Sequence, residues 1–191
     1  MASRDRLLVV LDARRRLFYL HHLMSDFYNP FAAPLIDSRG RRPEVSEILP
    51  QLFVGEYPRV EDVAWLKQTF GISAVFSLQD DEDLTAKGLS LSDLTQEYRL
   101  HEVEFRRTPV ADFNCDSLER ALPSALHIVH ELTQQSHTLF LHCNAGCNRA
   151  PTITIAYLHL HRQMGLEEAR DFVKERRPCG PYMDILYQYF R

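Results

Sequence analysis

A cysteine and an arginine lie six residues apart in a short glycine-containing stretch, Cys143 to Arg149. An apolar run precedes this stretch and a helix-like segment follows it, so we expect a strand, a loop and a helix N-terminus. Such a loop directs several backbone N–H groups at one point, which favours a bound phosphate. A thiolate there is a nucleophile, and a guanidinium can hold two phosphate oxygens. The stretch therefore predicts phosphoryl transfer through a cysteinyl-phosphate intermediate.

The loop and its flanks resemble the signature of a known enzyme superfamily. The pattern H-C-x2-G-x2-R, from His142 to Arg149, is similar to that of the cysteine-dependent protein tyrosine phosphatases, and specifically of their compact dual-specificity branch. The resemblance extends from about Glu47 to about Ile185. It implies that Cys143 is the nucleophile, that Arg149 clamps the phosphate and that His142 supports the loop. It implies no cofactor, and it assigns the phosphate-binding amides to Asn144, Ala145, Gly146, Cys147 and Asn148.

Two other interpretations of the cysteines have to be considered. Cys143 and Cys147 could be zinc ligands together with nearby histidines, but Arg149 would then place a cation beside the metal, and the chain has no C-x2-C pair. We therefore expect no metal site. Cys147 could also trap an oxidised Cys143 as a reversible disulfide, or it could simply be a small side chain packed behind the loop. The sequence leaves both of these open.

A phosphatase of this kind also needs a carboxylic acid, because an alkoxide leaves poorly without a proton. Asp112 precedes Cys143 by 31 residues, which is close to the separation in dual-specificity phosphatases, and we assign it the acid role. Asp116 begins a segment that resembles a capping box, so we expect it to be a helix N-cap instead. The remaining acidic candidates form one cluster: Asp80, Asp81, Glu82 and Asp83.

One position departs from the superfamily pattern. Ala150 follows Arg149 directly, where most members have a serine or threonine whose hydroxyl helps the thiolate leave the intermediate. Thr152 lies two residues further on and is expected to face elsewhere on the helix. We therefore expect the intermediate to be hydrolysed more slowly, or with different assistance.

Several segments resemble the glucan phosphatases, meaning the plant starch phosphatases and laforin. These segments are Cys143–Gly146, Arg149–Pro151, Leu78–Leu84, Asp112-Phe113 and Arg177–Pro181. The resemblance implies a phosphorylated glucan as substrate, with Phe113 and Tyr182 stacking on sugar rings. Tyr57, Tyr98 and Trp65 are further aromatic candidates. Asn148 stands where glucan phosphatases have a second loop glycine, which is a departure from their pattern.

Other substrates and functions remain as alternatives. A dual-specificity protein phosphatase would act on phosphotyrosine and phosphoserine or phosphothreonine. A lipid or inositol phosphatase is disfavoured, because the loop residues between Cys143 and Arg149 include no lysine or arginine for additional phosphates. A non-catalytic phosphate-binding module would leave Asp112 without a role.

The elements that position these residues alternate between strand and helix patterns from Glu47 onward. Strands are expected at Ile48–Val54, Ile72–Leu78 and His101–Phe105, and helices at Val60–Phe70, Ser117–Gln135 and after the loop, with a final helix from Tyr182. This alternation indicates an α/β fold, a single dual-specificity-phosphatase-like domain with a central mixed or parallel sheet covered by helices on both faces. Residues 1–46 indicate a helical extension and linker, and residues 47–191 the catalytic domain.

Composition agrees with a globular enzyme. The chain has 191 residues, is 45% apolar and carries a formal charge of −4, which argues against nucleic acid as the main partner. No apolar run approaches the roughly 18 residues that span a bilayer. We expect a reducing, cytoplasmic location, with a processed organelle precursor as the alternative. The oligomeric state does not follow from the sequence.

Overall fold

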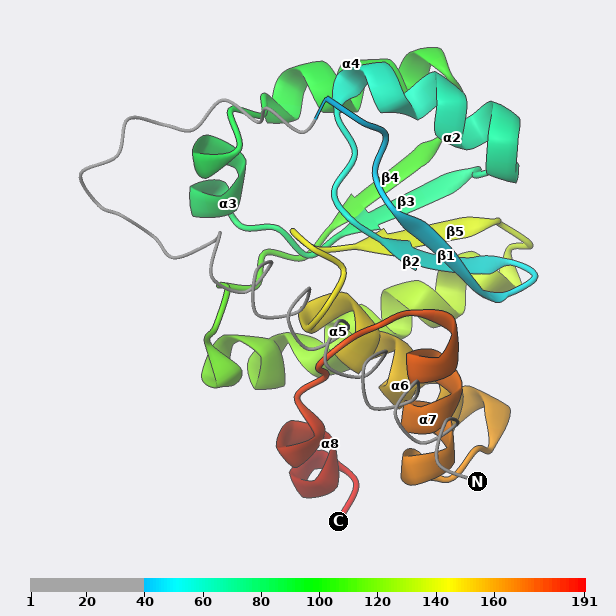
Figure 1. Cartoon of the computed structure of the whole chain (residues 1–191), viewed down its shortest axis with the longest axis vertical. Helices are drawn as coiled ribbons and strands as arrows, with labels where there is room; N and C mark the ends of the chain where they lie inside the picture. The colour runs from blue at the N-terminus through cyan, green and yellow to red at the C-terminus, as the bar shows by residue number, and fades with distance from the viewer. Residues whose placement is uncertain (1–39) are drawn as a thin grey trace, which may run out of the picture. The chain divides into compact units, whose positions relative to one another are not determined.

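A computed structural model describes residues 40–191 (Figure 1). The expected N-terminal helix therefore lies outside the described residues. The first strand, β1 (Val45–Leu49), includes the two residues just before the domain boundary that we expected at residue 47. Among the helices of residues 40–191, none is both long and apolar enough to cross a membrane.

Five strands form one mixed sheet in the order β1-β2-β5-β3-β4. The β1 strand pairs with β2 in the antiparallel sense, and all other neighbours are parallel. The strands after β1 are β2 (Leu52–Gly55), β3 (Ala74–Ser77), β4 (Glu104–Arg107) and β5 (Leu139–His142). The mixed sheet predicted from the sequence is confirmed.

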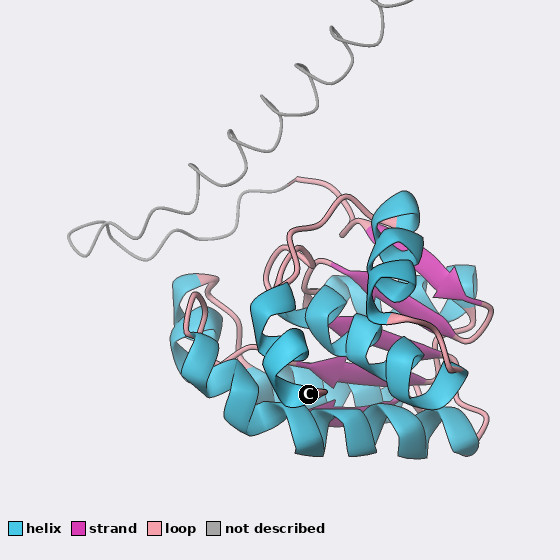
Figure 2. Cartoon of the chain, turned by 90° about the horizontal axis from the view of Figure 1, so that it is seen from below, coloured by secondary structure: helices cyan, strands magenta, loops and turns pink. Residues whose placement is uncertain are grey.

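Helices cover both faces of this sheet (Figures 1 and 2). One face packs against α2 (Val63–Phe70) and α4 (Leu91–Leu100). The opposite face packs against α5 (Cys115–Gln134), α6 (Arg149–Arg162), α7 (Leu166–Arg176) and α8 (Met183–Tyr189). The short helices η1 (Val60–Asp62) and α3 (Asp81–Ala86) lie in the connections.

The central strand β5 shows why the sheet is buried on both sides. Leu139 and Leu141 pack into the core beneath α5 and α6, whereas Phe140 packs into the core beneath α2 and α4. Successive side chains of a strand point to opposite faces, so a strand covered on both faces is apolar throughout. This burial holds β5 rigidly at the centre of the sheet, with the Cys143 loop at its end.

Two strand predictions were wrong in their bounds. The expected strand Ile48–Val54 is a tight hairpin, because Pro50 and Gln51 form a turn between β1 and β2. The expected strand His101–Phe105 begins too early, because His101 caps α4 and β4 starts only at Glu104. In both cases the strand boundary is set by a turn, at Pro50-Gln51 and at the end of α4, that the prediction did not take into account.

The N-terminus of α5 also differs from the prediction. Asn114, not Asp116, is the N-cap, since its side-chain Oδ1 accepts a hydrogen bond from the Ser117 amide at 2.9 Å. Asp116 lies in the first helical turn, where its negative charge interacts favourably with the positive end of the helix dipole. The helix begins upstream of Pro123 and continues through it.

Candidate active site

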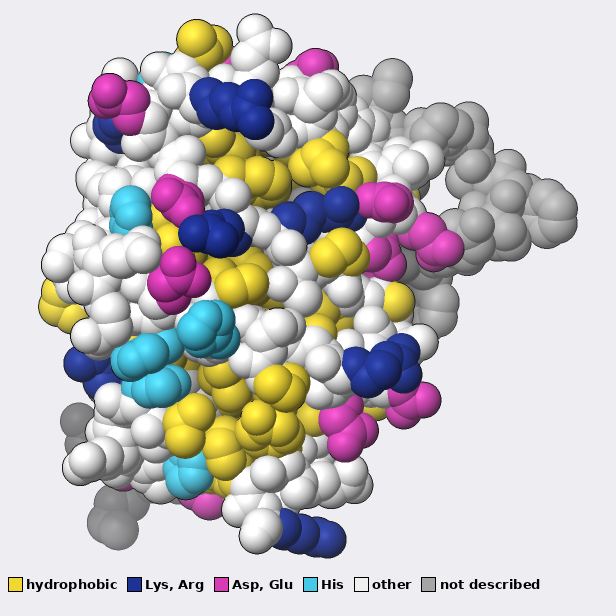
Figure 3. Space-filling model, turned by 180° about the vertical axis from the view of Figure 1, so that it is seen from behind, with side chains coloured by type: hydrophobic (Ala, Val, Ile, Leu, Met, Phe, Trp, Pro, Cys, Tyr) yellow, Lys and Arg dark blue, Asp and Glu magenta, His cyan; other side chains and the backbone are white. Residues whose placement is uncertain are grey.

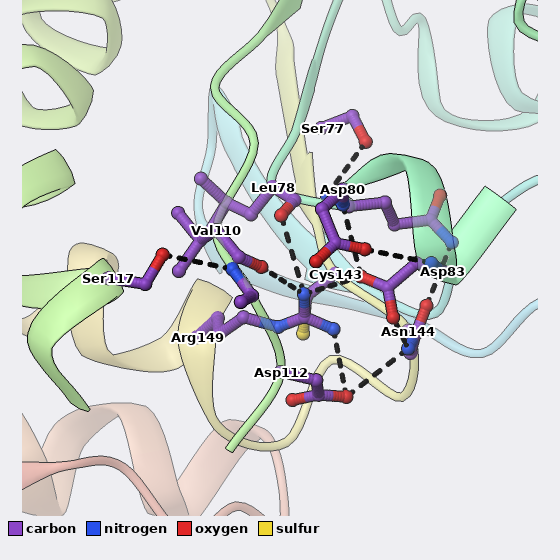
Figure 4. Close-up of polar contacts among 12 residues, drawn as sticks. Ser77, Leu78, Asp80, Asp83, Val110, Asp112, Ser117, Cys143, Asn144 and Arg149 are labelled. Atoms are coloured by element: carbon purple, nitrogen blue, oxygen red, sulfur yellow. Dashed lines mark hydrogen bonds and ion pairs between the residues drawn. The ribbon is translucent and has the colours of Figure 1, made fainter. Parts of the chain in front are cut away.

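The Cys143 loop lies at the carboxyl end of the parallel strands. It connects β5 to α6, and the strand register aligns the end of β5 with the ends of its two neighbours, since His142 pairs with both Gly55 and Ser77. The segments that follow β3 and β4 therefore reach the same edge. Ligands of open α/β sheets bind at this edge, and Figure 4 shows the polar contacts there.

A buried arginine from the C-terminal segment holds the loop backbone. Arg177 is 3% exposed, and it donates hydrogen bonds to the carbonyl oxygens of Gly146 (2.6 Å) and Ala145 (2.7 Å). The Gly180 amide donates to the Cys147 carbonyl at 2.9 Å. In a planar trans peptide the carbonyl and the next N–H point in opposite directions. The loop amides that follow these carbonyls are therefore directed away from the C-terminal segment.

Two glycines allow the loop to approach β2. Gly146 has a φ of +61°, and a Cβ on it would lie 2.3 Å from the Gly55 carbonyl oxygen and 2.6 Å from Arg177 Nη2. Gly55 is equally constrained, since its own Cβ would lie 2.3 Å from the Glu44 carbonyl oxygen. The loop contact therefore requires a residue without a Cβ at position 146, whereas Gly55 is required by the neighbouring Glu44 and Phe140.

Replacing Gly146 with alanine is expected to destabilise the domain by about 3 kcal/mol or more. This value combines the cost of a left-handed alanine with that of overpacking against Gly55. Gly71 is a matched control, since its φ is +67° and a Cβ on it would have no neighbouring atom within 4 Å. Gly71→Ala should cost only the backbone term of about 1 kcal/mol. Urea unfolding measures both, and equal losses would contradict the steric account.

Arg149 lies at the start of α6 and is 1% exposed. Its Nη1 donates hydrogen bonds to Asp83 Oδ2 and to the Val110 carbonyl oxygen, both at 2.6 Å (Figure 4). Its Nε and Nη2 are buried and make no hydrogen bond within residues 40–191. Burial lowers the pKa of Arg149, but Cys143, Asp112 and Asp83 outweigh this and raise it, so the guanidinium stays charged. One edge of the guanidinium is thus anchored, and the Nε–Nη2 edge has unused donors.

Asp112 lies beside this edge, on the segment between β4 and α5. Its Oδ2 is 3.0 Å from Arg149 Nη2 in an ion pair without hydrogen-bond geometry, and it accepts a hydrogen bond from Asn144 Nδ2 at 3.2 Å. Its side chain is 27% exposed. Burial raises the pKa of Asp112 and nearby Asp83 adds to the rise, against opposing effects of Arg149 and two hydrogen bonds. A raised pKa keeps a carboxylic acid protonated at higher pH, as a general acid requires.

Asp83 is a second carboxylate at the arginine, and the sequence had named it only as one member of the acidic cluster Asp80–Asp83. Its side chain is 8% exposed, and it forms an ion pair with Arg149 at 2.6 Å. It is also the third residue of α3, where its Oδ2 accepts a hydrogen bond from the Asp80 amide. A carboxylate so enclosed is suited to orienting the guanidinium, whereas the more exposed Asp112 is accessible to a leaving group. The acidic run Leu78–Leu84 was the only sequence signal for this residue.

The remaining loop residues have structural contacts. His142 is buried and stacks on Phe140 with ring centroids 5.6 Å apart. Asn148 precedes α6, and its Nδ2 donates to the Gly180 carbonyl oxygen at 2.7 Å. The Cys147 thiol points to the Ala145 carbonyl oxygen at 3.6 Å, and burial raises its pKa to about 11. This environment favours the packing interpretation of Cys147 over the redox interpretation.

No hydroxyl follows the arginine in a position to replace the missing serine or threonine. Ala150 is fully buried in the core. The Thr152 hydroxyl donates to the Asn148 carbonyl oxygen at 2.8 Å and accepts from the Tyr182 amide at 2.9 Å. Its hydrogen-bonding groups are therefore occupied in joining α6 to the C-terminal segment.

The aromatic candidates fall into two groups. Phe113 is 64% exposed and has a φ of +54°, a strained conformation for an aromatic residue. Tyr182 is partly buried against the core with a buried hydroxyl, and burial raises its pKa to about 12, with Asp112 and Cys143 contributing in the same direction. Tyr57 and Tyr98 are buried at 5% and 1% exposure, and so they are not available to a substrate. Trp65 is partly buried against the α2 and α4 side of the core.

Histidine side chains gather on one face of the domain (Figure 3). The rings of His130, on α5, and His161, on α6, stack with centroids 4.0 Å apart. Partial burial lowers the pKa of His161, and His130 and Arg162 add to this shift. Across residues 40–191, no group of three His, Cys, Asp or Glu side chains is arranged to hold a metal ion. The zinc interpretation therefore has no ligand set in this part of the chain.

A thiol at the start of the loop and a buried arginine at its end, on a mixed sheet, match the arrangement expected of a cysteine-dependent phosphatase domain. The chain belongs to a specific family within that class, since the family described as dual specificity phosphatase, catalytic domain, matches residues 52–191. The family and the fold class predicted from the sequence are both confirmed.

Characterised relatives include phosphatases of two kinds. The chain is 28% identical over 142 residues to phosphoglucan phosphatase DSP4, amyloplastic, of Castanea sativa, covering 73% of this chain and 38% of that protein. It is 30% identical over 161 residues to human dual specificity protein phosphatase 2, covering 82% of this chain and 46% of that protein. The chain thus spans less than half the length of each. Tk-PTP in its active form shares the fold, with a TM-score of 0.64, 24% identity, and coverage of 75% of this chain and 94% of that one.

The sequence did not reveal Arg177 or Gly55 as parts of the site. Arg177 belongs to Arg177–Pro181, which was noted only for its resemblance to glucan phosphatases, and Gly55 is an isolated glycine at the end of an apolar run. An isolated glycine in a strand does indicate close backbone approach, so this signal was present but unspecific. Both residues contact the loop across large separations in sequence.

Proposed function

We propose that this protein hydrolyses phosphate monoesters through a cysteinyl-phosphate intermediate. The observation that supports this best is the Nε–Nη2 edge of Arg149, which is buried, makes no hydrogen bond within residues 40–191 and faces the Asp112 carboxylate in an ion pair at 3.0 Å. A buried guanidinium with unused donors is costly unless an anion binds there, and a phosphate matches its fork geometry. Cys143 contributes to the raised pKa of Arg149, and both residues belong to the site in Figure 4, so we expect an anion bound by Arg149 to be within reach of the thiol.

In the first step, Cys143 attacks phosphorus as the thiolate. A sulfur–phosphorus bond forms and the bond to the leaving oxygen breaks, while Arg149 and the loop amides stabilise the charge on the non-bridging oxygens. Asp112, in its protonated form, donates a proton to the leaving oxygen. The products of this step are the free alcohol and the phosphorylated cysteine.

In the second step, water replaces the cysteine on phosphorus. Asp112, now ionised, accepts a proton from the attacking water, and the sulfur–phosphorus bond breaks to return the thiolate and inorganic phosphate. Ala150 supplies no hydroxyl to the departing sulfur. Thr152 is engaged with Asn148 and Tyr182, so we expect this second step to be slow relative to the first.

We further propose that the substrate is a phosphorylated glucan. Phe113 supports this choice, because it is a strongly exposed aromatic that directly follows the proposed acid. Sugar rings present C–H faces that stack on aromatic side chains, and the strained backbone at Phe113 is consistent with a functional role. Tyr182, which is partly buried, is the second aromatic candidate. The similarity to a phosphoglucan phosphatase is in agreement.

The alternative is a dual-specificity protein phosphatase. The similarity to human dual specificity protein phosphatase 2 favours it to the same degree, and the loop itself does not discriminate between carriers of the phosphate. The two substrates are separated by comparing phosphate release from solubilised phosphoglucan and from phosphotyrosine and phosphoserine peptides, at matched concentrations of phosphate ester. A strong preference for peptides would contradict the glucan proposal and leave the proposed chemistry intact.

Phe113→Ala is expected to lower kcat/KM for phosphoglucan by about 2- to 10-fold, which is the energy of one aromatic stacking contact. The rate on a small aryl phosphate should change much less, because that substrate does not extend beyond the loop. Leu100→Ala is the control, since Leu100 is a similarly exposed apolar side chain (68% exposed) at the end of α4. This helix leads into the amino end of β4, whereas the site lies at the carboxyl ends of the strands. Equal losses on both substrates would argue against a sugar platform.

A further inference from the structure

The side chain of Asn144 joins two carboxylates at the mouth of the site. Its Nδ2 donates hydrogen bonds to Asp83 Oδ1 and, at 3.2 Å, to Asp112 Oδ2 (Figure 4). Its Oδ1 accepts a hydrogen bond from Gln79 Nε2 at 2.8 Å. Gln79 is 1% exposed. The Gln79 donor determines the orientation of the amide, because a reversed amide would place its oxygen against both carboxylates.

Arg149 and Asn144 share the same oxygen of Asp112. Oδ2 lies 3.0 Å from Arg149 Nη2 and 3.2 Å from Asn144 Nδ2. Nη2 is also one of the two donors that a chelated phosphate requires. A phosphate dianion at this edge therefore competes with Asp112 for Nη2 and repels its carboxylate. After that exchange, the Asn144 amide is the side-chain contact that remains for Asp112.

The Asn144 contact also determines which oxygen carries the proton. An amide nitrogen donates and does not accept, so the oxygen that it holds must act as the acceptor. Oδ1, the other oxygen of the same carboxyl, accepts one hydrogen bond, from the Phe113 amide at 3.1 Å. Oδ2, in contrast, faces both Arg149 and Asn144, so the proton of the acid form is favoured on Oδ1. Asn144 directly follows Cys143 in the chain, so one residue links the nucleophile to the acid.

We propose that Asn144 is the positioning residue for the general acid: its amide, oriented by Gln79, holds Asp112 Oδ2 while the substrate phosphate occupies Arg149, and so directs the proton on Oδ1 towards the leaving oxygen. This inference rests on the proposed phosphatase function. It goes beyond that function because it assigns a role to the side chain of a loop residue whose expected contribution was its backbone amide.

The test uses the 191-residue chain and two substrates that differ in their need for an acid. An aryl phosphate with a good leaving group needs little protonation, whereas an alkyl phosphate such as phosphoserine peptide needs it fully. Asn144→Ala is expected to reduce kcat/KM, which reports the first step, at least about tenfold more for the alkyl substrate than for the aryl substrate. Asp112→Ala should lower the alkyl-to-aryl ratio, meaning kcat/KM for the alkyl substrate divided by kcat/KM for the aryl substrate, by a larger factor. This factor should fall within the roughly 10²- to 10⁴-fold range of general acid catalysis.

A double-mutant cycle separates positioning from loss of loop structure. In the Asp112→Ala background, Asn144→Ala should cause no further change in the alkyl-to-aryl ratio, because the group that it positions is gone. The pH profile provides a second readout. Asn144 donates to the ionised carboxylate and opposes the rise in the pKa of Asp112, so its loss should move the basic limb of kcat/KM to higher pH. A purely structural defect would lower both rates and leave that limb in place.

Gln79→Met keeps Asn144 in the chain and removes only the donor that orients it. It is expected to lower the alkyl-to-aryl ratio in the same direction by a smaller factor, and it serves as the test if Asn144→Ala does not fold. Absence of Cys143-dependent hydrolysis in the wild type would overturn both the proposed function and this inference. If the wild type is active and Asp112→Ala shows the leaving-group effect, an unchanged ratio in Asn144→Ala and Gln79→Met would overturn the inference alone.

Discussion

Cys143→Ser is expected to lower turnover of every phosphate monoester by about 10⁴- to 10⁶-fold, which is the range for removal of an enzymatic nucleophile. A serine hydroxyl at this position has no adjacent base, and it stays protonated where a thiolate would attack phosphorus. Initial rates with an aryl phosphate measure the loss. Anion binding should survive, because Arg149 and the loop amides are unchanged, and calorimetric titration with inorganic phosphate measures it.

Cys115→Ser provides the matched control for this substitution. Cys115 is exposed at the start of α5, so the same change of sulfur to oxygen is made there outside the loop. Its turnover should equal that of the wild type. Wild-type turnover in Cys143→Ser would remove the basis for a cysteinyl-phosphate intermediate.

Arg149→Lys is expected to lower kcat/KM by about 10²- to 10³-fold, comparable to the loss of a donor that stabilises developing negative charge. Lysine keeps the positive charge, but it offers no planar fork for two phosphate oxygens. All three donors of lysine are on one nitrogen, which would have to serve Asp83, the Val110 carbonyl and a phosphate from a single point, whereas the guanidinium has separate edges for the protein and the ligand.

The same substitution should destabilise the domain by about 1–3 kcal/mol, since it leaves buried acceptors without donors. Urea unfolding measures this loss independently of activity. Arg170→Lys is the control, because the ion pairs of Arg170 with Glu167 and Asp171 on α7 are partly exposed to solvent, and both its activity and its stability should match the wild type. Full activity of Arg149→Lys would show that the phosphate is bound without a bidentate clamp.

The family and the chemical class followed from the sequence because the chemistry is local. The proposed nucleophile, cradle amides and clamp all lie between Cys143 and Arg149, on one strand–loop–helix unit. Strand and helix periodicity was sufficient for the α/β class, because strands buried on both faces and amphipathic helices differ in their spacing. The roles assigned to the individual site residues, the cytoplasmic location and the domain boundary stay predictions.

The ends of the helices and strands were predicted less accurately from the sequence, for a physical reason that α5 illustrates. Asn114 and Asp116 are both good N-cap residues, and the choice between them depends on which side chain reaches a free amide. That is decided by how the segment after β4 enters the helix, where the Ser117 hydroxyl also accepts a hydrogen bond from the Ala111 amide at 3.0 Å. The N-cap propensities of Asn and Asp do not contain information about how the preceding segment enters the helix.

The surroundings of the Cys143–Arg149 stretch were decided only by the tertiary structure. Asp83 contacts Arg149 from 66 residues away, Asn144 contacts Gln79 from 65 residues away, and Arg177 reaches the loop carbonyls from 31 residues away. Hydrogen bonds and ion pairs act over about 3 Å in space and have no fixed spacing along the chain. By itself, the sequence therefore determined which residues could perform the chemistry, and the folded sheet edge decided which partners orient them.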